Sequence, residues 1–444
     1  MLKPRLIEIY TGAALRSLSR RLYAWDRFLC RRPRRVHYFH QCDDPYTQLL
    51  LEQLPDLLRR YQIELICHLV GPADDASTPD RERLAAWSRV DAERLAQELE
   101  LGFRDPGQAP DPKVVAAANS AIAALGTGRA WGEQELAQAA SIGAAVWGGD
   151  LGNLNLLGQA DSLTTERAIA AGRAQRKRRG HYSAATLYYE GEWYWGVDRL
   201  AYLQRRLVEE RALRVGRKAA ITATPPLLMQ PPIRRSGVDL QFYCSLRSPY
   251  SYLALGRVIA LADHYGANLQ LRFVLPMVMR GLPVPKAKRL YIVLDAKREA
   301  EQLGLPFGRI ADPLGEPTER GLAVLNRAIS VDKGAQFLTA FSHAVWAEGI
   351  DAGSDAGLFK IAKRAGLDRA FVRDALADPS WREVAQANRA EMLSLGLWGV
   401  PCFRVGAGAA YWGQDRLWLV ERDLMTSSSV PNDLGGETRS SDRP

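Results

Sequence analysis

Apolar and polar positions follow two periods along this chain, and the order of these periods predicts a unit that mixes strands and helices. Alternation with period two indicates a strand, whereas leucines three or four residues apart indicate a helix. In order, the predicted elements are a strand at 36–40, a helix at 46–60, a strand at 63–70, an alanine-rich helical stretch from about 80 to 180, strands at 185–190 and 193–195, and a helix at 198–211. Glu190-Gly191-Glu192 between the last two strands is a hairpin signal.

The same pattern returns in the second half of the chain. A shift of 204 residues lays 44–103 on 248–307 without a gap, and 17 of the 60 aligned positions are identical. This is about four times the number expected by chance at ordinary residue frequencies. Farther on, Trp195-Gly196-Val197-Asp198-Arg199-Leu200 matches Trp412-Gly413-Gln414-Asp415-Arg416-Leu417. We therefore interpret the chain as a tandem duplication.

Connectivity predicts the fold of each unit. A strand–helix–strand crossover makes its two strands parallel, and a tight hairpin makes the last two strands antiparallel. The predicted fold class is α/β, with two tandem thioredoxin-like domains, each a four-stranded mixed sheet with a long helical insertion. The expected segments are a basic helical arm at 1–33, a degenerate domain at 34–215, a proline-rich linker at 216–236, a second domain at 237–425 and a disordered tail at 426–444.

Composition excludes several classes of protein. The chain has 444 residues, 47% hydrophobic content and no run of 18 apolar residues, and charges interrupt its start. We therefore expect a cytoplasmic protein with neither a signal peptide nor a membrane partner. Its five cysteines are odd in number and scattered, and the sequence contains no C-x-x-C. Neither a disulfide framework nor a metal site is expected.

The formal net charge is +9, and the basic residues include two short clusters, Arg31-Arg32-Pro33-Arg34-Arg35 and Arg176-Lys177-Arg178-Arg179. Neither cluster lies in a recognised nucleic-acid-binding motif, so the pattern favours a solvated surface, and nucleic acid is not expected as a partner. A modest bias toward anionic small molecules stays open.

Ser248-Pro249-Tyr250-Ser251 follows an apolar-rich strand and begins a helix. It has the outline of a C-P-x-C redox turn in which hydroxyls replace both sulfurs, so it can form no disulfide. The entry to a helix favours an anion. A serine there can donate a hydrogen bond to an external thiolate, for which glutathione is the obvious soluble supplier. The alternative, which the turn alone favours, is that Ser248 is only an N-cap worth roughly 1 kcal/mol.

Five motifs occur in order across nearly all of 237–425. They are Ser248-Pro249-Tyr250-Ser251-Tyr252-Leu253, the run from Tyr291-Ile292-Val293-Leu294-Asp295 to Gly304-Leu305-Pro306-Phe307, Ala344-Val345-Trp346, Leu397-Trp398-Gly399-Val400-Pro401 and Trp412-Gly413-Gln414-Asp415-Arg416-Leu417. This ordered set resembles the DsbA-like thioredoxin superfamily, and within it the 2-hydroxychromene-2-carboxylate isomerases and kappa-class glutathione transferases. The first unit resembles the same superfamily more faintly.

The resemblance implies glutathione-dependent chemistry and a role for each matching residue. Ser248 would hydrogen-bond the glutathione sulfur, and Val400 would pair its backbone with the cysteinyl part of the peptide. Lys288 matches a lysine of the family and could steady an anionic oxygen of the substrate. The remaining binding residues implied are Tyr250, which would line the pocket, and Gln414 and Asp415, which would hold the γ-glutamyl end.

Pro401 stands where thioredoxin-like folds carry a cis proline, directly before a predicted strand. A cis bond there would turn the N–H and C=O of Val400 outward; the alternative is a trans proline that opens a strand. Asp415 either receives an ammonium group or caps the last helix. Cys402 is expected to be a small buried hydrophobe.

The first unit differs at the matching positions. Asp44, Thr47, Leu84 and Ala184 stand opposite Ser248, Ser251, Lys288 and Pro401. A carboxylate at the helix entry would repel a thiolate, and a cis bond without proline is costly. The first unit is therefore expected to have lost the site and to supply a partner surface or a pocket wall. Family members of this type pair, which implies a homodimer or an intramolecular pseudo-dimer.

The sequence thus favours a glutathione-dependent isomerase or transferase that acts on an electrophilic, aromatic small molecule, with the bound thiolate stabilised by Ser248. Two alternatives stay open. One is a protein like the DsbA-family thiol–disulfide oxidoreductases, which share the fold. The other is a non-catalytic binding or scaffold protein, suggested by the degenerate first unit, by the basic arm, and by the absence of an asparagine in 279–285, where family members carry one before the lysine.

Overall fold

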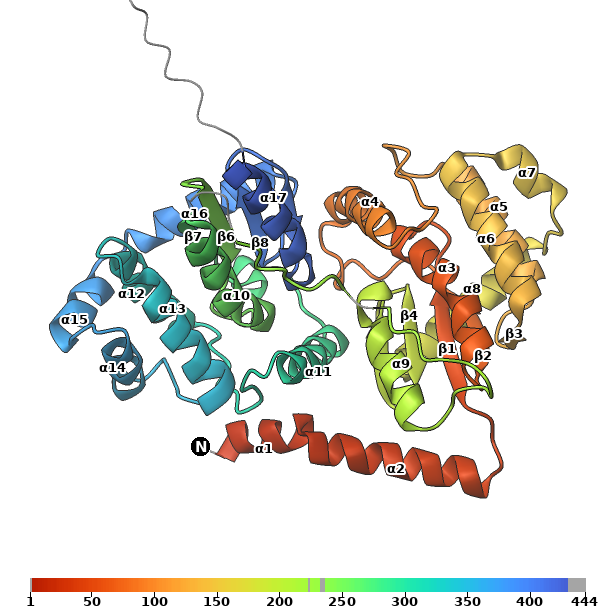
Figure 1. Ribbon diagram of the computed structural model, residues 1–444, viewed down its shortest axis with the longest axis horizontal. Helices are drawn as coiled ribbons and strands as arrows, with labels where there is room; N and C mark the ends of the chain where they lie inside the picture. Colours follow the sequence, from red (N-terminus) through yellow and green to blue (C-terminus); the bar gives the residue numbers. More distant parts are fainter. Residues whose placement is uncertain (1, 223, 232–235, 430–444) are drawn as a thin grey trace, which may run out of the picture. The chain divides into compact units, whose positions relative to one another are not determined.

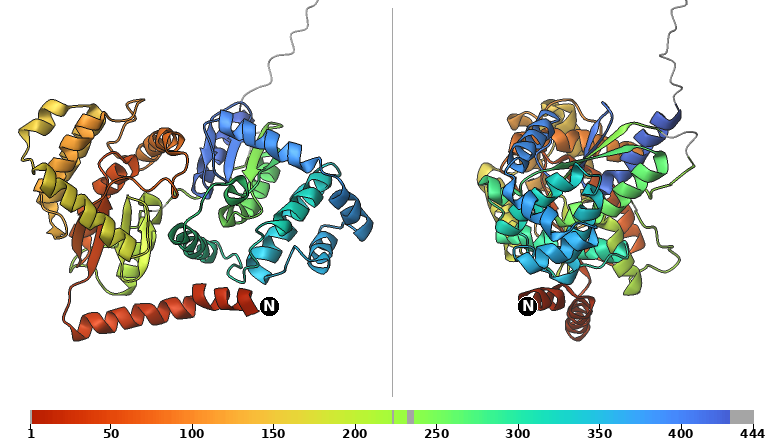
Figure 2. Two further views of the ribbon diagram at one scale, coloured as in Figure 1. Left: turned by 180° about the vertical axis from the view of Figure 1, so that it is seen from behind. Right: turned by 90° about the vertical axis from the view of Figure 1, so that its left-hand side faces the viewer.

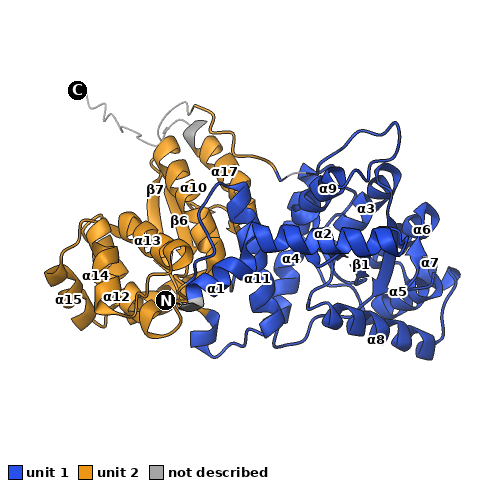
Figure 3. Ribbon diagram, turned by 90° about the horizontal axis from the view of Figure 1, so that it is seen from below, with its two compact units in different colours: residues 1–224, 277–310, 396–398 blue, residues 225–276, 311–395, 399–444 orange. Residues whose placement is uncertain are grey.

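The computed structural model describes residues 2–222, 224–231 and 236–429. The chain forms two compact units (Figure 3): residues 1–224, 277–310 and 396–398 make up the first, and residues 225–276, 311–395 and 399–444 the second. The expected linker at 216–236 and the expected tail at 426–444 lie partly outside the described residues. No helix in the described ranges is long and apolar enough to cross a membrane.

The first unit contains a five-stranded sheet in the order β3-β2-β1-β4-β5. Its strands are β1 (Arg35–His40), β2 (Glu64–Leu69), β3 (Ala130–Trp131), β4 (Thr186–Tyr189) and β5 (Glu192–Trp195). β1 and β2 are parallel, whereas β4 pairs antiparallel with both β1 and β5. The expectation of four strands was wrong here because β3 joins the edge, pairing Trp131 with Leu65. A two-residue strand is too short to produce an alternating pattern.

The second unit contains a four-stranded sheet in the order β7-β6-β8-β9, as the sequence predicts. The strands are β6 (Asp239–Cys244), β7 (Asn268–Phe273), β8 (Cys402–Val405) and β9 (Ala410–Trp412). β6 and β7 are parallel, and β8 pairs antiparallel with β6 and β9. The two sheets therefore share one connectivity apart from β3.

Figure 1 labels the helices of the first unit. They are α1 (Leu2–Thr11), α2 (Ala13–Leu29), α3 (Pro45–Arg60), α4 (Arg81–Glu98), α5 (Pro112–Ala124), α6 (Glu133–Gly148), α7 (Leu151–Leu156), α8 (Ser162–Arg178), the 3-10 turn η1 (Val197–Arg199) and α9 (Leu200–Glu209). Aspartates begin many of them: Asp80, Asp111, Asp150 and Asp161 each accept a backbone N–H of the first turn. Such caps satisfy donors that have no partner inside the helix.

The second unit has its own set of helices. They are α10 (Pro249–Tyr265), α12 (Glu316–Ile329), α13 (Gly334–His343), the π-helical turn η3 (Ala344–Glu348), α14 (Asp355–Arg364), α15 (Arg369–Ala377), α16 (Trp381–Ser394), the 3-10 turn η4 (Gln414–Arg416) and α17 (Leu417–Ser429). α10 packs against α13 and α17, and α12 to α15 pack against one another, as the view from behind shows (Figure 2).

The 3-10 turn η2 (Met277–Arg280) and α11 (Lys286–Gln302) follow β7 in the chain but pack in the first unit. A buried ion pair anchors α11 there: Arg199 Nε lies 2.9 Å from Asp295 Oδ1 and 3.2 Å from Glu299 Oε1. Arg199 is 5% exposed and Asp295 is 1% exposed. The compact units therefore do not follow the continuous segments that the sequence suggests.

The helical arm also belongs to the first unit. Arginines on one side of α2 bind carboxylates of the β4–β5 hairpin and α9: Arg20 Nε lies 2.6 Å from Glu192 Oε1, and Arg27 Nη2 lies 3.1 Å from Glu210 Oε2. Ion pairs hold the arm because its apolar side chains lie on the opposite side, where Leu22 and Trp25 are 60% and 67% exposed.

Candidate active site

Ser248 is the N-cap of α10, at the end of the loop that follows β6. Its backbone is extended (φ −100°, ψ 112°), and Pro249 follows at the first helical position, where a missing N–H is harmless. The Ser248 hydroxyl oxygen accepts the Ser251 N–H at 3.1 Å. The hydroxyl donates toward the Val400 carbonyl at 3.5 Å, a long and therefore weak hydrogen bond. Little holds the Ser248 proton in place.

The second hydroxyl of the turn has a different task. Ser251 is buried, and its oxygen accepts the backbone N–H of Ser245 at 3.3 Å. This bond fixes the loop between β6 and α10 from inside. Of the two hydroxyls that stand where a redox turn has sulfurs, Ser248 is the half-buried one and Ser251 serves the backbone.

The Val400-Pro401 peptide bond is cis, which confirms the sequence-based prediction. Val400 is half-buried, its carbonyl faces the Ser248 hydroxyl, and within the described part of the chain its N–H has no backbone partner. Gly399 precedes it and lies so close to the Trp412 indole that a Cβ there would overlap the ring. The turn at 399–401 is thus packed on β9 and brought beside the start of α10.

Gln414 and Asp415 lie in η4, where we expected them to bind the γ-glutamyl end of glutathione. Gln414 is buried: Arg257 of α10 donates a short hydrogen bond to its carbonyl oxygen, and its amide donates to Asp415 Oδ1 at 2.5 Å. Asp415 is half-buried. The pair is thus tied to the body of α10, and Asp415 is the member nearer the surface.

Sequence reasoning missed Arg257 and Gly399. Arg257 is a lone charge in the apolar stretch of α10, which was a signal that it needs a polar partner. Gly399 offered only its place beside the expected cis proline. Tyr250, in the first turn of α10, is half-buried beside this site.

Cys402 and Cys244 are buried thiols of the second sheet, which confirms the expectation for Cys402. Burial raises the pKa of Cys244 to about 12 and raises the pKa of Cys402 well above the usual range. A thiol is reactive as its thiolate, so these two cysteines are poor nucleophiles. Among the residues described here, no group of His, Cys, Asp and Glu is arranged to hold a metal ion.

Lys288 lies on α11 and therefore in the first unit, so it does not share a compact unit with Ser248. Its ammonium donates to the Ser77 carbonyl at 2.7 Å and lies 5.8 Å from the centre of the Tyr182 ring and 5.7 Å from that of Trp398. Burial lowers the pKa of Lys288 to about 8. Carbonyl oxygen and aromatic faces stabilise its charge.

At the matching helix start of the first unit, Asp44 caps α3 by accepting the Tyr46 N–H at 3.1 Å, and the Thr47 hydroxyl donates to its other oxygen at 3.1 Å. Burial raises the pKa of Asp44 to about 7, and neighbouring Asp43 adds to this. Ala184, opposite Pro401, is buried. The turn of the first unit therefore carries a carboxyl that ionises near neutral pH, whereas the turn of the second unit carries a hydroxyl that keeps its proton.

Comparison with known proteins agrees with the second unit's connectivity. Residues 239–425 match the model of the DSBA-like thioredoxin domain. The 2-hydroxychromene-2-carboxylate isomerase of Pseudomonas putida is 24% identical over 190 residues, 41% of this chain and 92% of the relative. That of Sphingobium xenophagum is 26% identical over 199 residues, 42% of this chain and 97% of the relative.

Among solved structures, a 2-hydroxychromene-2-carboxylate isomerase superposes with a TM-score of 0.35 at 25% identity, covering 42% of this chain and 93% of that one. The motifs that carry the sequence resemblance and the residues that meet at Ser248 belong to the matched segment. Residues 239–425 are therefore a DsbA-like thioredoxin domain whose relatives include the 2-hydroxychromene-2-carboxylate isomerases.

Proposed function

We propose that this protein is a glutathione-dependent isomerase or transferase that acts on an electrophilic, aromatic small molecule. The observation that carries the proposal is the Ser248 hydroxyl, which accepts a backbone N–H of α10 and, among the described residues, has only a 3.5 Å contact for its proton. Its relatives named as isomerases support the isomerase version. When bound, glutathione supplies a thiolate that adds reversibly to the substrate and leaves after bond rotation or ring reclosure.

Ser248 favours a thiolate over a thiol for two reasons. Its oxygen is occupied by the Ser251 N–H, so the hydroxyl meets a ligand as a donor. The start of the 17-residue helix α10 also places partial positive charge beside the sulfur position. Both effects lower the pKa of a bound thiol, whose ordinary value is roughly 8.5.

Val400 would hold the peptide part of glutathione. Its carbonyl lies 3.5 Å from the Ser248 hydroxyl, and its N–H has no backbone partner among the described residues, so both can pair with an extended peptide. Such backbone pairing selects a peptide rather than a general thiol. Tyr250 would line the pocket, and Pro401 fixes the turn. At the γ-glutamyl end we assign the ammonium to Asp415 and a positioning part to Gln414, because the Gln414 amide orients the carboxylate.

The test of Ser248 uses the full-length protein and a matched serine. Ser354 caps α14 by accepting the Gly357 N–H at 3.1 Å, so Ser354→Ala removes an equal cap far along the chain. Calorimetry with glutathione should give binding about tenfold weaker in Ser248→Ala, the loss expected for one hydrogen bond to a charged group. Ser354→Ala should bind as the unaltered protein does.

The thiolate absorbance of bound glutathione, followed against pH, should show a higher thiol pKa in Ser248→Ala. Equal affinities in the two variants would refute the role of Ser248. If neither glutathione nor its S-methyl analogue binds below millimolar concentration, the protein is better described as a scaffold.

Lys288 is proposed to steady an anionic oxygen of the substrate. Since burial holds the pKa of Lys288 at about 8, its cation is present below pH 8 and lost as the pH rises through that value. Turnover should therefore fall on the alkaline side with a midpoint near 8. In Lys288→Arg the cation persists, and this limb should disappear. Lys286→Arg, an exposed position of the same helix, is the control, and an unchanged profile in both variants argues against the role.

A thiol–disulfide oxidoreductase is less well supported, because the buried Cys402 and Cys244 thiols resist ionisation. Reduction of insulin disulfides without added glutathione would favour it. We also propose that the chain arose by duplication, supported by the shared order of β1-α3-β2 and β6-α10-β7 and by the two terminal hairpins. Asp44 and Ala184 then mark the copy that no longer binds a thiol.

A further inference from the structure

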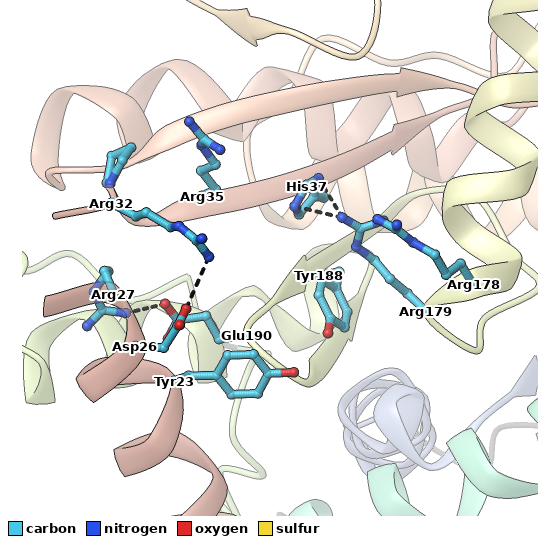
Figure 4. A pocket seen from close by; sticks show the side chains of 11 residues that line it. Tyr23, Asp26, Arg27, Arg32, Arg35, His37, Arg178, Arg179, Tyr188 and Glu190 are labelled. Atoms are coloured by element: carbon cyan, nitrogen blue, oxygen red, sulfur yellow. Dashed lines mark hydrogen bonds and ion pairs between the residues drawn. The ribbon is translucent and has the colours of Figure 1, made fainter. Parts of the chain in front are cut away.

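A cavity of about 490 Å³ opens in the first unit, between the C-terminal part of α2, the start of β1, the end of α8 and the β4–β5 hairpin (Figure 4). Pockets of this size hold ligands such as nucleotides. Its lining is polar and dominated by arginines: Tyr23, Asp26, Arg27, Arg32, Pro33, Arg35, His37, Arg178, Arg179, Tyr188 and Glu190. No residue of the proposed glutathione site belongs to it.

The cavity joins the two basic clusters, for which the sequence alone favours a solvated surface. Arg32 and Arg35 come from the segment before and at the start of β1, and Arg178 and Arg179 from the end of α8, more than 140 positions later. In Figure 4 the Arg179 side chain reaches back toward His37, which lies between the two groups. Two patches that sequence reasoning treated separately thus form one surface.

The arginines outnumber the carboxylates in the cavity lining. Five arginines face Asp26 and Glu190, a formal net charge of +3. Glu190 is held by Arg27 and by Arg206, and Asp26 by Arg32 at 3.2 Å. Across the described residues, neither Arg178 nor Arg179 has a carboxylate within ion-pair distance. Arg178 instead has a neutral partner: its Nη2 donates a hydrogen bond to Gln175 Oε1 at 2.9 Å.

Two neutral histidines form the wall behind Arg179. Arg179 donates to His37 Nε2 at 3.0 Å, and His37 Nδ1 lies 2.9 Å from His68 Nε2. Because an arginine can only donate, Nε2 of His37 is the acceptor and its Nδ1 carries the proton. Burial and the Arg179 charge lower the pKa of His37 to about 3. Across the part of the chain that the structure describes, no carboxylate forms an ion pair with the positive charge of this wall.

We propose that this cavity binds the phosphate group of a small organic phosphate. A carboxylate is planar and is satisfied by one arginine, whereas a phosphate has oxygens in a tetrahedral array and can accept from guanidinium groups arriving from several directions. Here Arg35 and Arg32 approach from one segment and Arg178 and Arg179 from another. The Tyr23 ring beside them is 39% exposed and offers a face for the organic part of the ligand, whereas the Tyr188 ring packs under the Arg179 guanidinium at 5.3 Å.

Calorimetry on the full-length protein tests the proposal with inorganic phosphate, adenosine 5′-monophosphate and adenosine. The nucleotide should bind at 150 mM salt, roughly the physiological ionic strength, and more tightly than phosphate, while adenosine should not bind. Arg178→Gln and Arg179→Gln should each weaken nucleotide binding by roughly ten- to a hundredfold. Lys177→Gln removes an equal charge from the same helix end, but outside the cavity, and should change affinity less than twofold.

Arg35→Gln is the second test, because Arg35 is exposed and forms an ion pair with the half-buried Glu64 at the start of β2, so its loss should leave folding intact. It should also weaken binding severalfold. Absence of nucleotide binding with a Kd of about 1 mM or tighter would refute the proposal. Equal losses of nucleotide affinity in Lys177→Gln and Arg179→Gln would also refute it, because they would indicate a diffuse basic surface. Binding of long single-stranded RNA without binding of the nucleotide would refute it as well.

Discussion

At the scale of single residues, the two helix starts that follow β1 and β6 show how one side chain changes the chemistry of a shared turn. Ser248 and Asp44 both cap a helix that begins with proline and tyrosine. Ser248 retains a proton that it can donate, whereas the Asp44 carboxyl is pushed toward its neutral form by burial. The cap is common to both turns, but Asp44 loses its proton as the pH rises through about 7, whereas Ser248 keeps a hydroxyl donor for a thiolate.

Asp44 gives a prediction about stability. Its pKa rises from 3.8 to about 7 on folding, so the folded state holds the proton more tightly, and the resulting stability is present below pH 4 and lost as the pH rises through 7. Asp44→Asn does not titrate and should become more stable than the unaltered protein above pH 7, by about 2 kcal/mol for a half-buried carboxyl.

Urea unfolding at pH 4 and pH 8 measures the effect of Asp44→Asn. Asp111→Asn, at the exposed cap of α5, is the matched control and should show no comparable gain at the higher pH. A difference for Asp44→Asn that is the same at both pH values would contradict the assigned titration.

At the scale of elements, the turn at 399–401 depends on the absence of a side chain. Gly399→Ala would place a methyl group in the Trp412 ring and should lower the free energy of unfolding by about 1–3 kcal/mol. Because Val400 follows directly, glutathione affinity should fall with it. Gly256→Ala, at an exposed position of α10 with open space around it, should instead raise stability by roughly 0.5–1 kcal/mol.

Chemical denaturation and calorimetry on both glycine variants separate the two effects. If Gly399→Ala loses stability but keeps its affinity for glutathione, Val400 is not part of the binding site. If Gly399→Ala keeps both its stability and its glutathione affinity, residue 399 does not pack closely on the Trp412 ring.

Elements with a strong local pattern could be predicted from sequence. The alternating strands, the Glu190-Gly191-Glu192 hairpin and the helix start at Ser248 have such patterns, as does the cis Val400-Pro401 bond within its motif. β3 could not be predicted, because Ala130–Trp131 is too short to show a period. The contact between Gln414 and Arg257 could not be predicted either, because the two residues are 157 positions apart and neither sequence position indicates the other as its partner.

At the scale of the whole molecule, α11 follows β7 in the chain but packs in the first unit, so the folding units are not continuous segments. Asp295 and Glu299 of α11 lie against Arg199, which belongs to the segment before the linker. Arg298 adds a hydrogen bond to the Trp193 carbonyl at 2.9 Å. The expected boundary near 216–236 separates these partners in sequence, although they share one buried network. No local pattern indicates a partner 96 positions away.

This arrangement predicts that the two halves of the chain do not fold independently. Fragment 1–224 alone would leave the buried Arg199 without Asp295, and fragment 225–444 alone would expose α11. Breaking a buried ion pair costs about 3–5 kcal/mol, a large part of the stability of a domain.

Each fragment should therefore be digested quickly by protease and show weak secondary structure, whereas the mixed fragments should copurify and become resistant. Arg199→Leu in fragment 1–224 should abolish this rescue, whereas Arg205→Leu, which removes a hydrogen bond to Gln302 and a contact with the Tyr202 ring from the neighbouring helix α9, should reduce it slightly. Independent, protease-resistant folding of both fragments would mean that α11 does not need the first unit.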